Sequence, residues 1–230
     1  MRGSWVSSLE DQEFYSITGD QFHHLAHVVR VEVGEELLLL DGKGKSAKTV
    51  IESISKREIK AKKLEILVHE RSFSFDLALG MPKKEALELS LKQAVELGFR
   101  KIYLIRSAYS QMKPLDPERL NQILVSALEQ SNAPFLPEAV YVSWEGVNWE
   151  SYQEALMLDS QVGIGQKYDN FDSKTPKLLI VGPEGGFSPE ERSLIQSKIK
   201  VIGLKLPTPI LRTPTAVAAG AGFLLGELLK

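Results

Sequence analysis

The stretch of this chain best suited to binding a small ligand is a glycine-rich turn. Residues 180–188 read Ile-Val-Gly-Pro-Glu-Gly-Gly-Phe-Ser and end a short apolar run. Glycine permits positive φ and lets a ligand approach the backbone without a Cβ in the way. Small ligands of α/β proteins bind at the carboxyl ends of strands. The turn is therefore a candidate binding loop, although an ordinary strand-to-helix turn would also contain Gly-Gly.

A second candidate segment lies near the C-terminus and reads Ile-Gly-Leu-Lys-Leu-Pro-Thr-Pro-Ile-Leu-Arg-Thr-Pro-Thr-Ala over 202–216. Its prolines at 207 and 209 remove backbone donors and predict a non-helical loop. Thr213 followed by Pro214 predicts an N-cap and the first residue of a helix that runs to Leu229. Gly220 and Gly222 each cost that helix up to about 1 kcal/mol relative to alanine. They indicate that another backbone, a subunit or a ligand packs closely there.

The elements around these segments alternate between strand and helix from residue 75 onward, which predicts a largely parallel sheet. Ser188, Pro189 and Glu191 have the spacing of an N-cap, a first helical residue and a capping-box partner. The expected strands are 75–79, 101–105, 139–142 and 155–158, and the expected helices are 84–97 and 117–130. Residues 1–72 read mainly as strands (36–41, 47–54 and 59–68) with a short helix at 20–29, as in a small barrel.

Composition narrows the chemistry. The chain has 230 residues, a formal net charge of −2 and no cysteine. Disulfides, thiolate metal sites and catalysis through a covalent cysteine adduct are therefore closed routes. His23, His24 and His27 lack an obvious further ligand, which favours a structural helix over a metal site. No long apolar segment or signal-peptide pattern occurs, and we expect a soluble, cytoplasmic protein.

Residues 43–63 form a locally basic segment in this otherwise slightly acidic chain. They carry eight basic and two acidic residues. Phosphate contacts dominate RNA affinity, so this stripe is a candidate RNA contact. A solvated strand face is the alternative.

The motif Gly-Pro-Glu-Gly-Gly-Phe-Ser-x-x-Glu followed by Ile-Leu-Arg-Thr-x-Thr-Ala resembles the RsmE family of 16S rRNA (uracil-N3) methyltransferases of the SPOUT superfamily. Residues 23–44, 92–98 and 129–131 are also similar to family signatures. The resemblance implies an α/β fold: a SPOUT methyltransferase domain at 73–230, with a parallel sheet and a C-terminal trefoil knot. It also implies a small PUA-like, RNA-binding β-barrel domain at 1–72.

The resemblance further implies a homodimer that transfers a methyl group from S-adenosylmethionine (SAM) to N3 of a uridine in 16S rRNA of the 30S subunit. The implied catalytic residues are Arg212, Thr213 and Thr215. The implied cofactor contacts are Val181, Gly182, Pro183, Glu184, Gly185, Gly186, Leu204, Leu206, Ile210 and Leu211. The implied RNA contacts are Arg30, Lys43, Lys45, Lys56, Arg57 and Lys60.

The chain departs from the family pattern where arginines are usual, with Tyr109, Ala133 and Pro209 in three such regions. Arginine grips phosphates bidentately, and none of these replacements does so. Two alternatives therefore stay open: a relative that methylates another RNA site, and a protein that binds SAM or RNA without turnover.

Overall fold

The computed structural model describes residues 1–159, 161 and 175–229. The chain divides into two compact units. One unit consists of residues 1–70 and 125–136, and the other consists of residues 71–124 and 137–230.

The first unit is built on a five-stranded sheet in the order β1-β3-β4-β5-β2. Its strands are β1 (Arg2–Trp5), β2 (Phe14–Ile17), β3 (Glu36–Leu40), β4 (Lys45–Ile54) and β5 (Ile59–Val68). Strand β1 pairs with β3 in parallel and the other pairs are antiparallel. The helix α1 (Gly19–His23) continues as a π-helical segment (His24–Val29) that ends at Arg30 with φ 60°. The expected strands and the short helix are confirmed.

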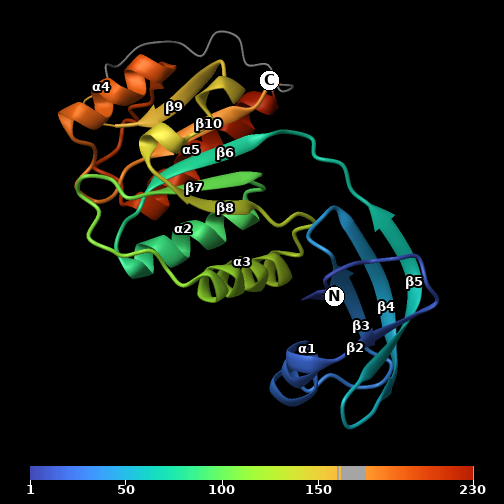
Figure 1. Cartoon of the computed structure of the whole chain (residues 1–230). Coiled ribbons are helices and arrows are strands. Elements are labelled where there is room, and N and C mark those ends of the chain that lie inside the picture. The colour runs from blue at the N-terminus through green and yellow to red at the C-terminus, as the bar shows by residue number, and fades with distance from the viewer. Residues whose placement is uncertain (160, 162–174, 230) are drawn as a thin grey trace. The chain divides into compact units, whose positions relative to one another are not determined.

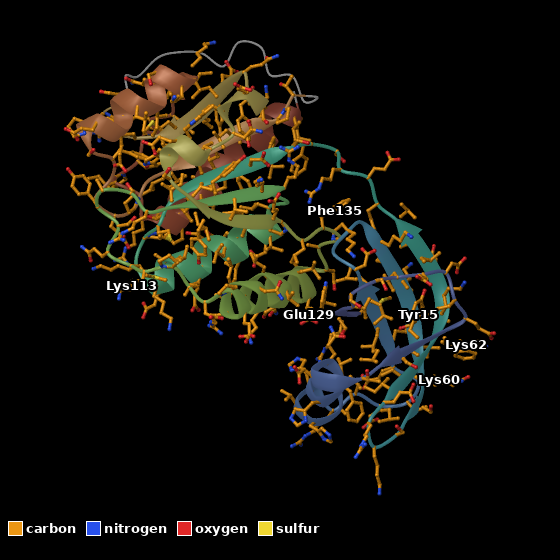
Figure 2. The ribbon with its side chains drawn as sticks, viewed as in Figure 1. Tyr15, Lys60, Lys62, Lys113, Glu129 and Phe135 are labelled. Carbon is orange, nitrogen blue, oxygen red and sulfur yellow. The ribbon has the colours of Figure 1, made fainter. Side chains whose placement is uncertain are left out.

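Residues 125–136 complete this unit from far along the sequence. The carboxylate of Glu129 accepts a hydrogen bond from the backbone N–H of Trp5 at 2.8 Å, and Lys43 and Phe135 form an isolated β-bridge. Burial raises the pKa of Glu129, whereas the Trp5 N–H lowers it, with a net upward shift. Figure 2 labels Glu129 and Phe135 with the barrel residues Tyr15, Lys60 and Lys62.

The second unit is built on a six-stranded sheet in the order β11-β9-β10-β6-β7-β8. Every pair in it is parallel, as the strand–helix alternation predicted. Its strands are β6 (Phe75–Gly80), β7 (Lys101–Ile105), β8 (Glu138–Val142), β9 (Glu154–Leu158), β10 (Lys177–Val181) and β11 (Lys200–Gly203). The central strands β6 and β10 are buried at every position, because helices cover both faces of the sheet.

Helices pack on the two faces of this sheet (Figure 1). On one face α5 contacts β10, β9 and α2. On the other, α4 and the 3-10 turns at Trp144–Gly146 and Trp149–Ser151 enclose a core that includes Trp144, Phe187 and Ile195. The helices are α2 (Lys84–Glu96), α3 (Pro117–Ser131), α4 (Pro189–Lys198) and α5 (Thr213–Leu228). Within the described part of the chain, no helix is long and apolar enough to cross a membrane.

One of the two helix glycines explains the close approach predicted for α5. A Cβ at Gly220 would lie 2.7 Å from Leu179 Cδ1 and 2.9 Å from Leu158 Cδ1, so the close neighbour is the chain's own sheet. A Cβ at Gly222 would meet nothing within 4 Å. Gly220 is therefore required by packing within the fold, and Gly222 leaves an open helix surface.

Candidate active site

A cavity of about 510 Å³ lies at the carboxyl ends of β9, β10 and β11. Every residue predicted for the cofactor lines it: Val181, Gly182, Pro183, Glu184, Gly185, Gly186, Leu204, Leu206, Ile210 and Leu211. The two segments singled out in the sequence therefore form the walls of one cavity. Its position follows the rule for open parallel sheets, in which ligands bind beyond the carboxyl ends of strands.

The glycine-rich loop is held tightly against its surroundings. Gly186 has φ 69°, which glycine adopts without strain, and its N–H donates to the Pro183 carbonyl at 2.9 Å. A Cβ on Gly80, at the end of β6, would lie 2.6 Å from Pro183 Cδ. A Cβ on Gly185 would lie 2.8 Å from Tyr109 Cβ. Close neighbours therefore require glycine at positions 80 and 185.

Thr213 is not the N-cap of the last helix, contrary to the prediction. The N-cap is Arg212, whose carbonyl accepts the first helical hydrogen bond from Ala216 N at 2.8 Å. Thr213 is the first helical residue, and its buried hydroxyl donates to the Gly182 carbonyl at 3.1 Å. The threonine side chain thus joins the two walls of the cavity instead of capping its own helix.

The capping box of α4 is confirmed and reaches further than its sequence motif indicates. Ser188 Oγ accepts from Glu191 N, and Glu191 Oε2 accepts from Ser188 N at 2.9 Å. Glu191 Oε1 also accepts from Ser107 Oγ at 2.7 Å, Ala108 N at 2.9 Å and Trp144 Nε1 at 2.8 Å. Burial raises the pKa of Glu191, but these hydrogen bonds outweigh burial and the net shift is downward. One buried carboxylate thereby fixes α4, the loop after β7 and the Trp144 turn.

Glu184 lies on the cavity lining with an exposed side chain. Its carboxylate accepts from Lys83 N at 3.2 Å, at the N-terminus of α2. A negative charge is favourable there because the first N–H groups of a helix lack intrahelical partners. The contact links the glycine-rich loop with the segment after β6.

Sequence reasoning missed an ion pair on the cavity wall. Arg192 Nε lies 2.5 Å from Asp159 Oδ2, and the two side chains are 17% and 4% exposed. Both residues line the cavity. The hydrogen bond to Asp159 raises the pKa of Arg192. Asp159 directly follows β9, and its place at a strand's carboxyl end was the one available signal.

The other two predicted catalytic residues lie just outside this lining. Arg212 and Thr215 are both exposed, at the N-cap and in the first turn of α5. Among the described residues, no hydrogen-bond or ion-pair partner is found for the Arg212 guanidinium. A free, planar cation follows the cavity loop directly, where it remains available to a substrate.

The predicted RNA contacts lie in the first unit, and some are already paired. Lys60 Nζ lies 3.1 Å from Glu52 Oε2 and 3.8 Å from the centroid of the Phe14 ring. Lys43 Nζ donates to the Ser7 carbonyl at 3.1 Å. The other predicted contacts are exposed: Arg30, Lys45, Lys56 and Arg57. Lys60 and Lys62 alternate with buried residues of β5 and so share its outer face (Figure 2).

No three His, Asp or Glu side chains of the described residues gather closely enough to hold a metal ion. The rings of His23 and His27 lie with their centroids 4.9 Å apart and their planes tilted by 51°, and His27 also contacts Phe22 edge-on.

Comparison with known proteins decides the family. A family model described as an RNA methyltransferase domain matches residues 69–224. The chain belongs to this RNA methyltransferase family. A second model, described as an RNA methyltransferase PUA domain, matches residues 17–64.

The relatives of this family member include proteins named ribosomal RNA small subunit methyltransferase E. The Bacillus subtilis protein is 27% identical in an alignment 226 residues long that covers 90% of this chain and 88% of the relative. The Rickettsia conorii protein is 28% identical and covers 84% of this chain and 82% of its own length. A crystal structure of the Neisseria gonorrhoeae protein of that name, bound to S-adenosyl methionine, matches 99% of this chain and 98% of that one with a TM-score of 0.86 at 21% identity. The shared fold thus extends over nearly the whole chain.

Proposed function

We propose that this family member transfers a methyl group from SAM to N3 of a uridine in 16S rRNA of the small ribosomal subunit. The observation that carries the proposal is the single cavity at the carboxyl ends of β9–β11, walled by both of the motif segments. The names of the relatives support the choice of substrate. A protein acting on ribosomal subunits in bacteria works in the cytoplasm.

The cavity fits SAM in size and in the chemistry of its lining. Its volume of about 510 Å³ lies within the range of small-ligand sites. Leu204, Leu206 and Leu211 offer apolar surface to an adenine ring, and the backbone of the glycine-rich loop offers donors and acceptors to polar groups. A Cβ at Gly186 would point into space with nothing within 4 Å, so the backbone is accessible there. We propose further that these two loops form the trefoil knot that the resemblance implies.

SAM supplies an electrophilic methyl group on a sulfonium. Uridine N3 carries a proton and must lose it before or during attack, so negative charge develops on the uracil ring. Arg212, with its exposed guanidinium beside the cavity loop, is the proposed stabiliser of that charge. The Thr213 hydroxyl donates its one hydrogen bond to the Gly182 carbonyl, which leaves the hydroxyl oxygen the proposed role of acceptor toward a substrate. Thr215 is exposed in the first turn of the helix and is the proposed donor to the base.

The proposed domain roles follow. The proposed RNA-gripping barrel is the unit of residues 1–70 and 125–136, so the expected domain 1–72 gains a distant segment. The proposed methyltransferase domain, expected at 73–230, is the unit of residues 71–124 and 137–230. Arg30, Lys45, Lys56 and Arg57 are exposed cations on the barrel, and Lys43 and Lys60 add charge beside them. Their contacts would be to phosphates, which contribute affinity and little sequence selection.

We also propose a homodimer that uses the open face of α5. Gly222 and Gly226 are one helical turn apart, and a Cβ on either would meet nothing within 4 Å. Leu229, at the end of this helix, is 89% exposed. Two backbones approach most closely where glycines align on one side of a helix. Light scattering on the purified chain tests this proposal, and a monomer at micromolar concentration would refute it.

Nucleoside mass spectrometry tests the activity. Unmodified 30S subunits would be incubated with the protein and SAM, with an active relative as the positive control. We expect 3-methyluridine in 16S rRNA. A different methylated nucleoside would indicate another RNA site. No product, together with measurable SAM binding, would indicate a binding protein without turnover.

A further inference from the structure

We infer that the ring of Tyr109 is a stacking platform for an unpaired RNA base at the rim of the cavity. The inference rests on the proposed function and names a residue that selects its substrate. Tyr109 lies in the loop after β7, and its side chain is 48% exposed.

The Cβ and Cγ atoms of Tyr109 pack against the cavity loop. There is no room for a Cβ on Gly185, because one would lie 2.8 Å from Tyr109 Cβ and 3.1 Å from Tyr109 Cγ. The φ of Gly185 is not in the left-handed region, so the approach of Tyr109 is what requires glycine. Gly185 lines the cavity, so the Tyr109 side chain starts beside its rim.

The loop that carries Tyr109 is anchored on both sides of its base. Ser107 Oγ and Ala108 N, the two residues before it, donate to the buried carboxylate of Glu191. Ser107 N donates to Ser110 Oγ at 3.0 Å, and Ser110 N donates to the Ser107 carbonyl at 3.0 Å. An exposed aromatic ring on so firmly held a backbone loses little freedom when a ligand covers it.

The same loop carries one exposed cation before Tyr109 in the sequence and one after it. They are Arg106 and Lys113, of which Figure 2 labels Lys113. Exposed aromatic rings placed among cations are how proteins hold single-stranded nucleic acid: the cations contact phosphates and the rings stack on bases. A uridine in folded rRNA must leave its stack to reach an enzyme's cavity, and a ring at the rim replaces part of the stacking that is lost.

Two substitutions distinguish the contribution of the aromatic ring from the contributions of the hydroxyl and of apolar volume. Tyr109→Phe keeps the ring, and Tyr109→Leu keeps an apolar side chain without it. Leu89→Ala is the matched control, since Leu89 is 49% exposed on α2 and does not line the cavity. KM and kcat for unmodified 30S subunits, the Kd for SAM by calorimetry and the binding of 30S subunits by sedimentation would be measured for each.

We expect Tyr109→Leu to weaken 30S binding and raise its KM by about 5- to 150-fold, the range that corresponds to the stacking of one base. Tyr109→Phe and Leu89→Ala should stay within about twofold of wild type, with the Kd for SAM unchanged in all three. Three results would each overturn the inference. They are an equal loss of 30S binding in Tyr109→Phe and Tyr109→Leu, unchanged 30S binding in Tyr109→Leu, and a parallel loss of SAM binding in Tyr109→Leu. Failure of the wild type to methylate would overturn the proposed function instead, while the sedimentation series still decides the role of Tyr109.

Discussion

The side-chain hydroxyl of Thr213 donates a hydrogen bond to the backbone carbonyl of Gly182, 3.1 Å away. Both residues line the cavity, and they come from the two segments that wall it. The bond couples the position of the last helix to the position of the glycine-rich loop.

Thr213→Val removes this hydroxyl at nearly constant volume. The buried Gly182 carbonyl then loses its partner, which should cost about 1–3 kcal/mol of unfolding free energy. Urea unfolding followed by circular dichroism measures this loss. Thr213→Ser, which keeps the hydroxyl, should recover most of it, and equal stability of Val and Ser variants would show that the bond contributes nothing.

Gly185→Ala should weaken SAM binding by at least about tenfold, because the added Cβ cannot share the space held by Tyr109. Calorimetric titration with SAM gives the Kd directly. Leu89→Ala is the control: its side chain is 49% exposed on α2 and does not line the cavity, so SAM affinity should be unchanged. Wild-type affinity in Gly185→Ala would show that the loop moves freely around Tyr109.

Glu191 should make the free energy of unfolding depend on pH in the acidic range. Its pKa is shifted below the ordinary 4.5, so its ionised form contributes stability that is fully present above about 4.5 and is lost as pH falls through the lower folded value. Glu191→Gln should lose on the order of 2–3 kcal/mol at pH 7, since an amide cannot accept at both ends.

The difference in unfolding free energy between the wild type and Glu191→Gln should therefore stay constant above about pH 4.5 and narrow as the pH falls from there toward 3. Urea midpoints collected across that range measure it. A difference that stays constant down to pH 3 would mean that folding does not lower the pKa of Glu191.

Arg212→Ala should lower turnover by about 100-fold or more and leave the Kd for SAM unchanged, because the proposed role is stabilisation of charge on the uracil. Its side chain is exposed, so the free energy of unfolding should change by less than about 0.5 kcal/mol. Single-turnover methylation of 30S subunits isolates the chemical step. Arg212→Lys keeps the charge without the planar guanidinium, so its turnover should lie between those of the wild type and Arg212→Ala. Full activity of Arg212→Ala would exclude a role for Arg212 in stabilising charge on the uracil.

Local sequence patterns predicted the helices and strands well, but they did not predict the long-range contacts. The Ser188–Glu191 capping box spans three residues and is legible in the chain. The bonds from Glu191 to Ser107 and Trp144 cross 84 and 47 positions and have no local signature. The Thr213 hydroxyl was misplaced for the same reason, since its partner lies 31 positions away. The Asp159–Arg192 ion pair could not be predicted either, because it depends on which strands lie next to each other in the sheet. The meeting of the two motif segments came from the family resemblance, because periodicity says nothing of how loops meet.

Residues 125–136 belong to the same compact unit as residues 1–70, although they stand in the second half of helix α3 and the turn beyond it. The backbone N–H of Trp5 donates a hydrogen bond to the Glu129 carboxylate, and Lys43 forms an isolated β-bridge with Phe135. The barrel is thus a discontinuous domain. A fragment cut at residue 70 would lack part of its own structure, and grafting the barrel onto another enzyme would require carrying this distant segment with it.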